Sequence, residues 1–119
     1  MKIFVICSVR GASEEYKQKL ETYVEKLEAE DHNVHLPHRD TDQNADGITI
    51  LKINTRAIVT SDEVHIFYSK ESQGTHFDMG VAFSNYKKIV VVENEVYGSG
   101  KSFPRVLDEW EKRGIDWSV

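Results

Sequence analysis

Several features that would narrow the class of this protein are scarce or missing in its sequence. Cys7 is the only cysteine, so no intrachain disulfide can form, and we expect a reducing, cytoplasmic compartment. No apolar run approaches the length of about 20 residues that a membrane-spanning helix needs, and the run after Lys2 is also too short for a signal-peptide core. We therefore expect no membrane partner.

Excess basic charge is also missing. The 15 Lys and Arg residues are outnumbered by 20 Asp and Glu residues, which gives a net charge of -5. Without a basic stripe to neutralise phosphates, we expect no nucleic-acid partner, whereas a small anionic ligand remains compatible with a local field. The His, Asp and Glu residues show no metal-ligand spacing, so we expect neither a metal nor a cofactor. At 119 residues the chain is long enough for a single domain over residues 1–119.

What the sequence does contain is a regular alternation of strand and helix patterns. The expected strands cover residues 3–7, 33–36, 63–68 and 89–92, and the expected helices follow Ser13, cover 48–60, start near His76 and follow Ser102. This order predicts an α/β fold, a three-layer α/β/α sandwich with a flavodoxin-like or Rossmann-like parallel sheet in the order 2-1-3-4. The tail at residues 114–119 could add a fifth strand.

Two segments carry further expectations. In the last helix, we expect an apolar face toward the core, formed by Phe103, Val106, Leu107 and Trp110. The segment from Pro37 to Gly47 reads as a long polar loop. Its side chains could supply an acid, a base or a sugar contact near the carboxyl end of the sheet, and those residues are His38, Asp40 and Asp42.

The stretch from Glu63 to Phe83 reads as a strand, a polar loop and a helix. Backbone N–H groups at the start of such a helix attract an anion, and Asp78 lies about one turn inside it. The first strand is also followed by a polar loop. If the sheet has the predicted order, the two loops meet where the connections diverge, and together they offer the hydroxyls, guanidinium and N–H groups that a phosphate needs. Either loop alone is ordinary turn and capping chemistry.

Two motifs in these loops resemble the nucleoside 2-deoxyribosyltransferase family, including the 2'-deoxynucleoside 5'-phosphate N-hydrolases. The first is Ser72-Gln73-Gly74 followed by Phe77-Asp78-Met79-Gly80-Val81-Ala82, where the family has Ser-x-Gly and then Glu-x-Gly-x-Ala with a nucleophilic Glu. The second is Ser8-Val9-Arg10-Gly11, which is similar to the phosphate-contacting loop of the hydrolases.

The resemblance implies an enzyme that acts on the N-glycosidic bond of a nucleoside or nucleotide, by hydrolysis or base exchange, as a homodimer or higher homo-oligomer. It implies a nucleophile at Asp78, a second catalytic position at Asn54, and a group of residues around the 5'-phosphate, namely Ser8, Arg10, Gly11, Ser72 and Gly74. Three positions differ from the family pattern. Asp78 replaces Glu and withdraws the carboxylate by about 1.5 Å, Asn54 replaces Asp, and Cys7 replaces Gly.

Two other hypotheses remain open at the level of the sequence. One is a catalytically inactive relative that binds a nucleotide as a sensor. The other is a flavodoxin-like or receiver-like domain, but Cys7 and Ser8 stand where a phospho-acceptor domain would have acids. His65 alternates within a strand and is expected to be structural, and of Phe67, Tyr68 and Phe77 at least two are expected to pack in the core.

Overall fold

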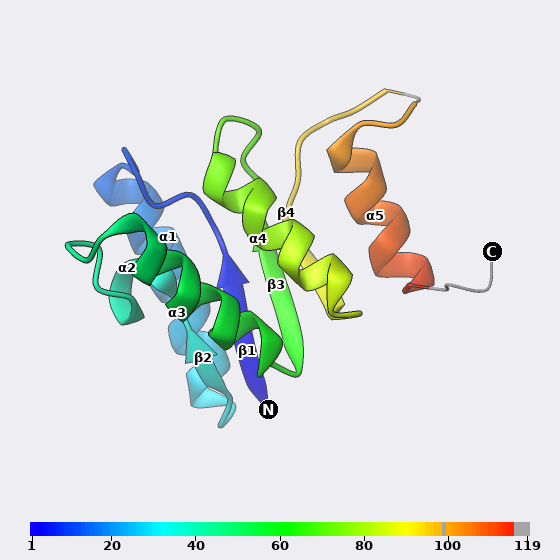
Figure 1. The fold of residues 1–119 in the computed structure, drawn as a ribbon. Helices are drawn as coiled ribbons and strands as arrows, with labels where there is room; N and C mark the ends of the chain where they lie inside the picture. The colour runs from blue at the N-terminus through cyan, green and yellow to red at the C-terminus, as the bar shows by residue number, and fades with distance from the viewer. Residues whose placement is uncertain (99, 116–119) are drawn as a thin grey trace.

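A computed structural model describes residues 1–98 and 100–115 (Figure 1). Each strand is followed by one helix, except that β2 is followed by two. The elements are β1 (Lys2–Ile6), α1 (Glu14–Ala29), β2 (Asn33–His35), α2 (Pro37–Asp40), α3 (Gly47–Val59), β3 (Glu63–Phe67), α4 (Gln73–Ser84), β4 (Lys88–Glu93) and α5 (Phe103–Arg113). Within the described residues, no helix has the length and apolar character that crossing a bilayer requires.

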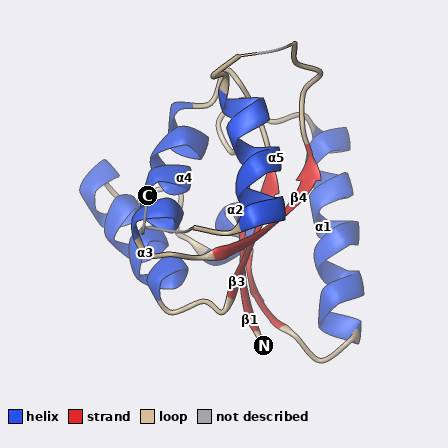
Figure 2. Ribbon diagram, turned by 90° about the vertical axis from the view of Figure 1, so that its right-hand side faces the viewer, coloured by secondary structure: helices blue, strands red, loops and turns tan. Residues whose placement is uncertain are grey.

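The four strands form one parallel sheet in the order β2-β1-β3-β4, which confirms the predicted order. Alternate residues of β1 point to opposite faces of this sheet. Phe4 and Ile6 pack with side chains of α3, α4 and α5, and Ile3 and Val5 pack with side chains of α1. The result is three layers, in which α1 covers one face of the sheet and α3, α4 and α5 cover the other (Figure 2).

Helix starts follow the polar residues that the sequence places before each apolar repeat. The side chains of Ser13, Asp46 and Ser72 each accept a hydrogen bond from a backbone N–H in the first turn of α1, α3 and α4. These side-chain caps satisfy donors that the helix itself cannot pair. The caps therefore fix where each helix begins, and so where each loop after a strand ends.

Two predicted boundaries are wrong. The segment 37–47 is not a continuous loop, because its first residues form α2, where Pro37 occupies the first turn with a φ already suited to a helix. Helix α4 begins at Gln73 rather than near His76, because the Ser72 side chain caps it earlier than the apolar periodicity suggested. Gly74 and Thr75 thus lie in the first helical turn and not in the loop.

The predicted apolar face of α5 is half correct. Leu107 and Trp110 are buried in the core beside α4, but Phe103 is 56% exposed and Val106 is 36% exposed. Phe103 is the first residue of α5 and extends past the end of the sheet, where its ring contacts His76 rather than the core. Most of the possible fifth strand, 116–119, lies outside the described residues.

Candidate functional site

The candidate site lies at the carboxyl edge of the sheet, where β1 and β3 end side by side. The chain leaves β1 toward α1 on one face and leaves β3 toward α4 on the other, so the two connections diverge from neighbouring strands. In open α/β sheets, ligands bind in the crevice that forms at such a divergence. The structure therefore brings together the two loops that the motifs had singled out.

The loop after β1 is a tight turn with an exposed guanidinium. The N–H of Ala12 donates to the carbonyl of Val9 at 3.3 Å, and Gly11, the third residue of this turn, has a φ of +69°. That conformation strains any residue with a Cβ, so the turn itself requires glycine. Arg10 is exposed and has no ion pair or hydrogen bond to the described residues, which leaves its side chain available to an anion.

The loop after β3 leads into an open helix N-terminus. The Ser72 hydroxyl accepts a hydrogen bond from the N–H of Thr75 at 3.1 Å, and the N–H groups of Gln73 and Gly74 have no acceptor among the described residues. A Cβ added to Gly74 would meet only the Ser72 Oγ, at 4.0 Å. Packing therefore does not demand glycine at this position, and the backbone here is open to a ligand. An anion is favoured by these free donors and by the helix dipole.

Asp78 is the one carboxylic acid of this region that the fold buries. It is 7% exposed, and it has no hydrogen bond to any described residue. Burial raises the pKa of Asp78 from 3.8 to about 7, because desolvation disfavours the ionised form. Burial, and to a lesser extent the charge of Asp78, raises the pKa of the Cys7 thiol to about 12, which keeps that thiol protonated. A buried carboxyl group without a partner is costly for the fold, which marks Asp78 as a functional candidate.

His76 lies on a different side of α4 from Asp78, since two positions along a helix are about 200° apart. Its Nδ1 donates to the carbonyl of Ser72 at 2.8 Å, and its Nε2 is 2.9 Å from the hydroxyl of Tyr68. With Phe103 it lines a separate cavity of about 520 Å³ at the start of α5. The described contacts therefore direct His76 toward α5.

Asn54 lies in the middle of α3 and is 8% exposed. Its Oδ1 accepts a hydrogen bond of 2.7 Å from the hydroxyl of Thr41, and that hydroxyl oxygen is 2.8 Å from Nε2 of His35. Because the Thr41 proton goes to Asn54, the His35 Nε2 must donate. The chain of three side chains fixes the orientation of the amide, and its NH₂ group has no partner among the described residues. It remains free to donate to a ligand.

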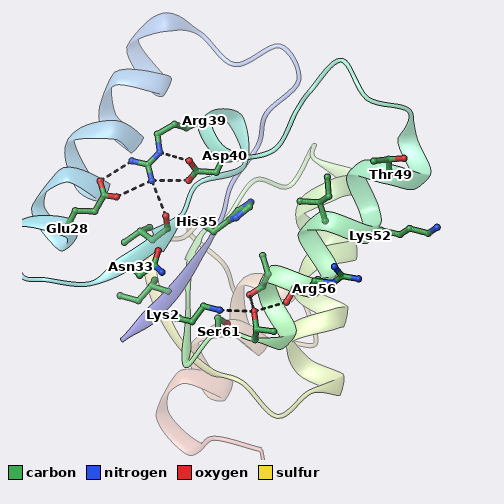
Figure 3. A pocket seen from close by; sticks show the side chains of 15 residues that line it. Lys2, Glu28, Asn33, His35, Arg39, Asp40, Thr49, Lys52, Arg56 and Ser61 are labelled. Carbon is green, nitrogen blue, oxygen red and sulfur yellow. Dashed lines mark hydrogen bonds and ion pairs between the residues drawn. The ribbon is translucent and has the colours of Figure 1, made fainter.

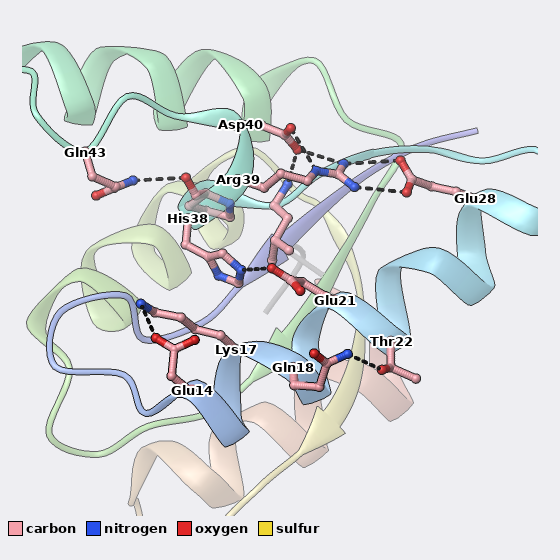
Figure 4. A network of polar contacts seen from close by, with 12 residues as sticks. Glu14, Lys17, Gln18, Glu21, Thr22, Glu28, His38, Arg39, Asp40 and Gln43 are labelled. Carbon is pink, nitrogen blue, oxygen red and sulfur yellow. Dashed lines mark hydrogen bonds and ion pairs between the residues drawn. The ribbon is translucent and has the colours of Figure 1, made fainter.

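Contacts made by the three polar residues after β2 tie them to the scaffold, and Figure 4 shows those of His38 and Asp40. Asp40 accepts from the N–H of Leu36 and binds Arg39, and these bonds lower the pKa of its carboxyl. Asp42 accepts from the N–H of Asn44. His38 is nearly buried against α1, with Nε2 at 3.4 Å from Glu21 Oε1 but without hydrogen-bond geometry. Their predicted role at the base or sugar stays a prediction.

The structure also settles the expected structural aromatic and histidine positions. Phe67 and Tyr68 are buried, and His65 is buried between the Tyr23 hydroxyl at 2.6 Å and the Glu63 carboxylate at 2.7 Å. Phe77 is 47% exposed on the outer face of α4. Sequence reasoning missed Thr41, because a threonine after a short helix carries no signal of a contact with a helix that follows it. Among the described residues, no group of three or more His, Cys, Asp or Glu side chains could hold a metal.

Comparison with known proteins supports the fold. No protein-family model matches the chain, and no curated protein matches its sequence. Among solved structures, a 2-deoxyribosyltransferase from Bacillus psychrosaccharolyticus superposes with a TM-score of 0.68 and 16% identity over 82% of this chain and 77% of that chain. A 2-deoxyribosyltransferase from Leishmania mexicana gives a TM-score of 0.58 and 23% identity over 79% of this chain and 65% of that one.

A CMP N-glycosidase from Clostridium botulinum gives a TM-score of 0.57 and 23% identity over 75% of this chain. The match spans 66% of that enzyme's length. These identities are low, and what they establish is a shared arrangement of strands and helices. The chain thus has the α/β fold of the 2-deoxyribosyltransferases and the CMP N-glycosidase, and the resemblance read from its two motifs is confirmed at the level of the fold.

Proposed function

We propose that this protein cleaves the N-glycosidic bond of a nucleoside 5'-monophosphate, with Asp78 as the nucleophile. The observation that carries the proposal is the position of Asp78, which is buried, lacks a partner among the described residues and lies at the carboxyl edge of the sheet. A structural carboxylate would be paired, because an isolated buried charge destabilises a fold. A carboxylate kept for chemistry has to remain unpaired until substrate binds.

The two loops support a phosphate on the substrate. Arg10 supplies a free guanidinium, the start of α4 supplies free N–H groups at Gln73 and Gly74, and Ser8 adds a half-buried hydroxyl. Charge-assisted hydrogen bonds of this kind hold a phosphate strongly. A CMP N-glycosidase is among the proteins with this fold, which is consistent with a phosphorylated substrate.

In the proposed reaction, an Asp78 carboxylate oxygen forms a bond to the anomeric carbon of the sugar. The bond from that carbon to the base nitrogen breaks, and its electron pair leaves with the base, which takes up a proton from solvent. Water then attacks the same carbon, releases the carboxylate and gives up a proton to solvent, as in retaining glycosidases; a second base in place of water would give transfer. The amide NH₂ of Asn54 orients a substrate oxygen and carries no charge.

A second candidate function is favoured by the same burial. Asp78 carries a side chain one methylene shorter than Glu, and burial raises its pKa to about 7, so the protonated form is populated at neutral pH. A protonated, recessed acid cannot attack carbon, but it can donate a hydrogen bond to a bound nucleotide. The alternative is therefore a nucleotide sensor without turnover.

The outer faces of α3 and α4 support a homodimer. Both helices are rich in apolar residues, and side chains that stay exposed there include Ile48 at 62%, Val59 at 44% and Phe77 at 47%. Large apolar side chains that stay exposed on neighbouring helices are commonly covered by a partner. A second copy of the chain, packed against α3 and α4, would cover this surface close to the candidate site.

The test is to incubate the full chain with ribo- and deoxyribonucleoside 5'-monophosphates and to measure free base by chromatography and binding by thermal shift. We expect base release that Asp78→Ala abolishes and that Glu25→Ala, which removes an exposed carboxylate on α1, leaves unchanged. Turnover that persists in Asp78→Ala would refute the nucleophile. Stabilisation by nucleotide without release of base would establish the sensor instead.

A further inference from the structure

A second cavity lies away from Asp78, along the outer edge of the sheet. It has a volume of about 770 Å³ and lies between the edge strand β2 and helix α3, reaching the amino ends of β1 and β2 at Lys2 and Asn33 (Figure 3). None of the residues that the two motifs place at the candidate site lines it. Pockets of about 300–1,000 Å³ are the size that holds small organic molecules.

Basic residues from three different elements line this cavity. They come from β1, α2 and α3, and they are Lys2, Arg39, Lys52 and Arg56. The two carboxylates of the lining, Glu28 and Asp40, both bind Arg39, at 2.9 Å each. Both acidic side chains of the lining are therefore neutralised by the Arg39 guanidinium.

The remaining three cations have no carboxylate partner in the described part of the chain. Lys52 and Arg56 lie one turn apart on α3, and their side chains make no ion pair or hydrogen bond to any described residue. Among those residues, the Lys2 ammonium contacts only the Thr60 hydroxyl, at 3.3 Å. In a chain with a net charge of -5, an accumulation of unpaired positive charge around one cavity is a local exception. It provides a field that attracts an anion.

The floor of the cavity is apolar and includes one aromatic ring. Ile3, Val34, Ile53 and Ala57 line it together with His35. The His35 ring is stacked on Phe4 with centroids 5.3 Å apart and planes 14° apart, and burial lowers its pKa, so it is neutral at pH 7. An apolar floor with a flat ring can contact the uncharged body of an organic ligand, whereas an inorganic ion has no such body to place there.

We propose that this cavity is a second ligand site, which binds a small organic anion. The phosphate or carboxylate group of the ligand meets the ammonium and guanidinium groups of Lys2, Lys52 and Arg56, and its planar or apolar body lies on the floor beside His35. Three unpaired cations are too few, on an acidic chain, for the many phosphate contacts that nucleic-acid binding uses. This proposal does not rest on the proposed activity at Asp78.

The test uses the isotope-labelled full chain and three probes, phenyl phosphate, benzoate and inorganic phosphate, followed by amide chemical shifts. We expect saturable shifts of amide signals in β2 and α3 with phenyl phosphate or with benzoate. The one of these two that binds more tightly is the preferred probe, and inorganic phosphate should bind more weakly than it does. The double variant Lys52→Glu/Arg56→Glu should weaken the preferred probe by about tenfold or more, because two charge-assisted contacts are lost.

Two controls separate this site from others. Lys26→Glu/Lys112→Glu makes the same change in net charge on exposed side chains elsewhere, and Arg10→Ala alters the candidate site for phosphate. Both should bind the preferred probe at β2 and α3 with unchanged affinity. The proposal is overturned by shifts confined to the loops after β1 and β3, by equal affinity in the Lys52→Glu/Arg56→Glu variant, or by no saturable shift with any probe.

Discussion

Replacement of Asp78 by Asn should stabilise the protein, and the gain should depend on pH. The folded-state pKa of Asp78 is about 7, against 3.8 in the unfolded chain. Because the folded state holds this proton more tightly, protonation of Asp78 contributes to the free energy of unfolding. This contribution is fully present below pH 4 and is lost as the pH rises through 7. Asn keeps the shape of the side chain and does not ionise.

The size of the effect follows from the shift in pKa. A difference of about three pKa units corresponds to about 4 kcal/mol at 1.36 kcal/mol per unit, which is an upper value because the ionised side chain can recruit water. The difference in unfolding free energy between Asp78→Asn and the unaltered chain should be constant below pH 4 and should grow by up to about 4 kcal/mol at pH 8. In melting temperature this is on the order of 10 °C.

Urea denaturation followed by circular dichroism at pH 4, 6 and 8 measures this difference. All other ionisable groups titrate in both proteins, so the comparison isolates position 78. Glu25→Gln, an exposed carboxylate on α1, serves as the control and should give no pH-dependent gain. A stability difference that is flat from pH 4 to pH 8 would show that Asp78 is paired or hydrated in solution, and the argument for its role would fail.

Three further predictions follow from the structure. If Asp78 attacks as a carboxylate, kcat/KM should rise about tenfold per pH unit below 7 and level off above it, whereas a profile that falls with pH would indicate a general acid. Thr41→Val should lower the free energy of unfolding, measured by urea denaturation, by about 1–3 kcal/mol, because it removes the hydrogen bonds to Asn54 and His35. Thr41→Ser should keep both hydrogen bonds, and an equal loss of stability in the two variants would contradict the role of the hydroxyl. Phe77→Glu should shift the protein from dimer to monomer in sedimentation velocity, and an unchanged sedimentation coefficient would exclude the outer face of α4 as the contact.

Much of the fold was predictable because its signals are local. The apolar run at Ile3 to Cys7 and the capping residue Ser13 depend only on neighbours within a few positions, and such local signals placed the strands and most helices correctly. The errors at Pro37 and Phe103 share one cause. Whether a short polar segment closes a helical turn, or whether an apolar side chain reaches the core, depends on where the end of the sheet lies.

Local sequence patterns are enough to predict the order of strands and helices, the two polar loops and the presence of a carboxylate after the second loop. Three features of the site depend instead on tertiary packing: Asp78 is buried without a partner among the described residues, Thr41 orients Asn54, and His76 turns away toward α5. Burial and hydrogen bonding between distant residues depend on how helices pack on a sheet. A pKa that moves by several units is a property of that packing, and no local pattern of residues encodes it.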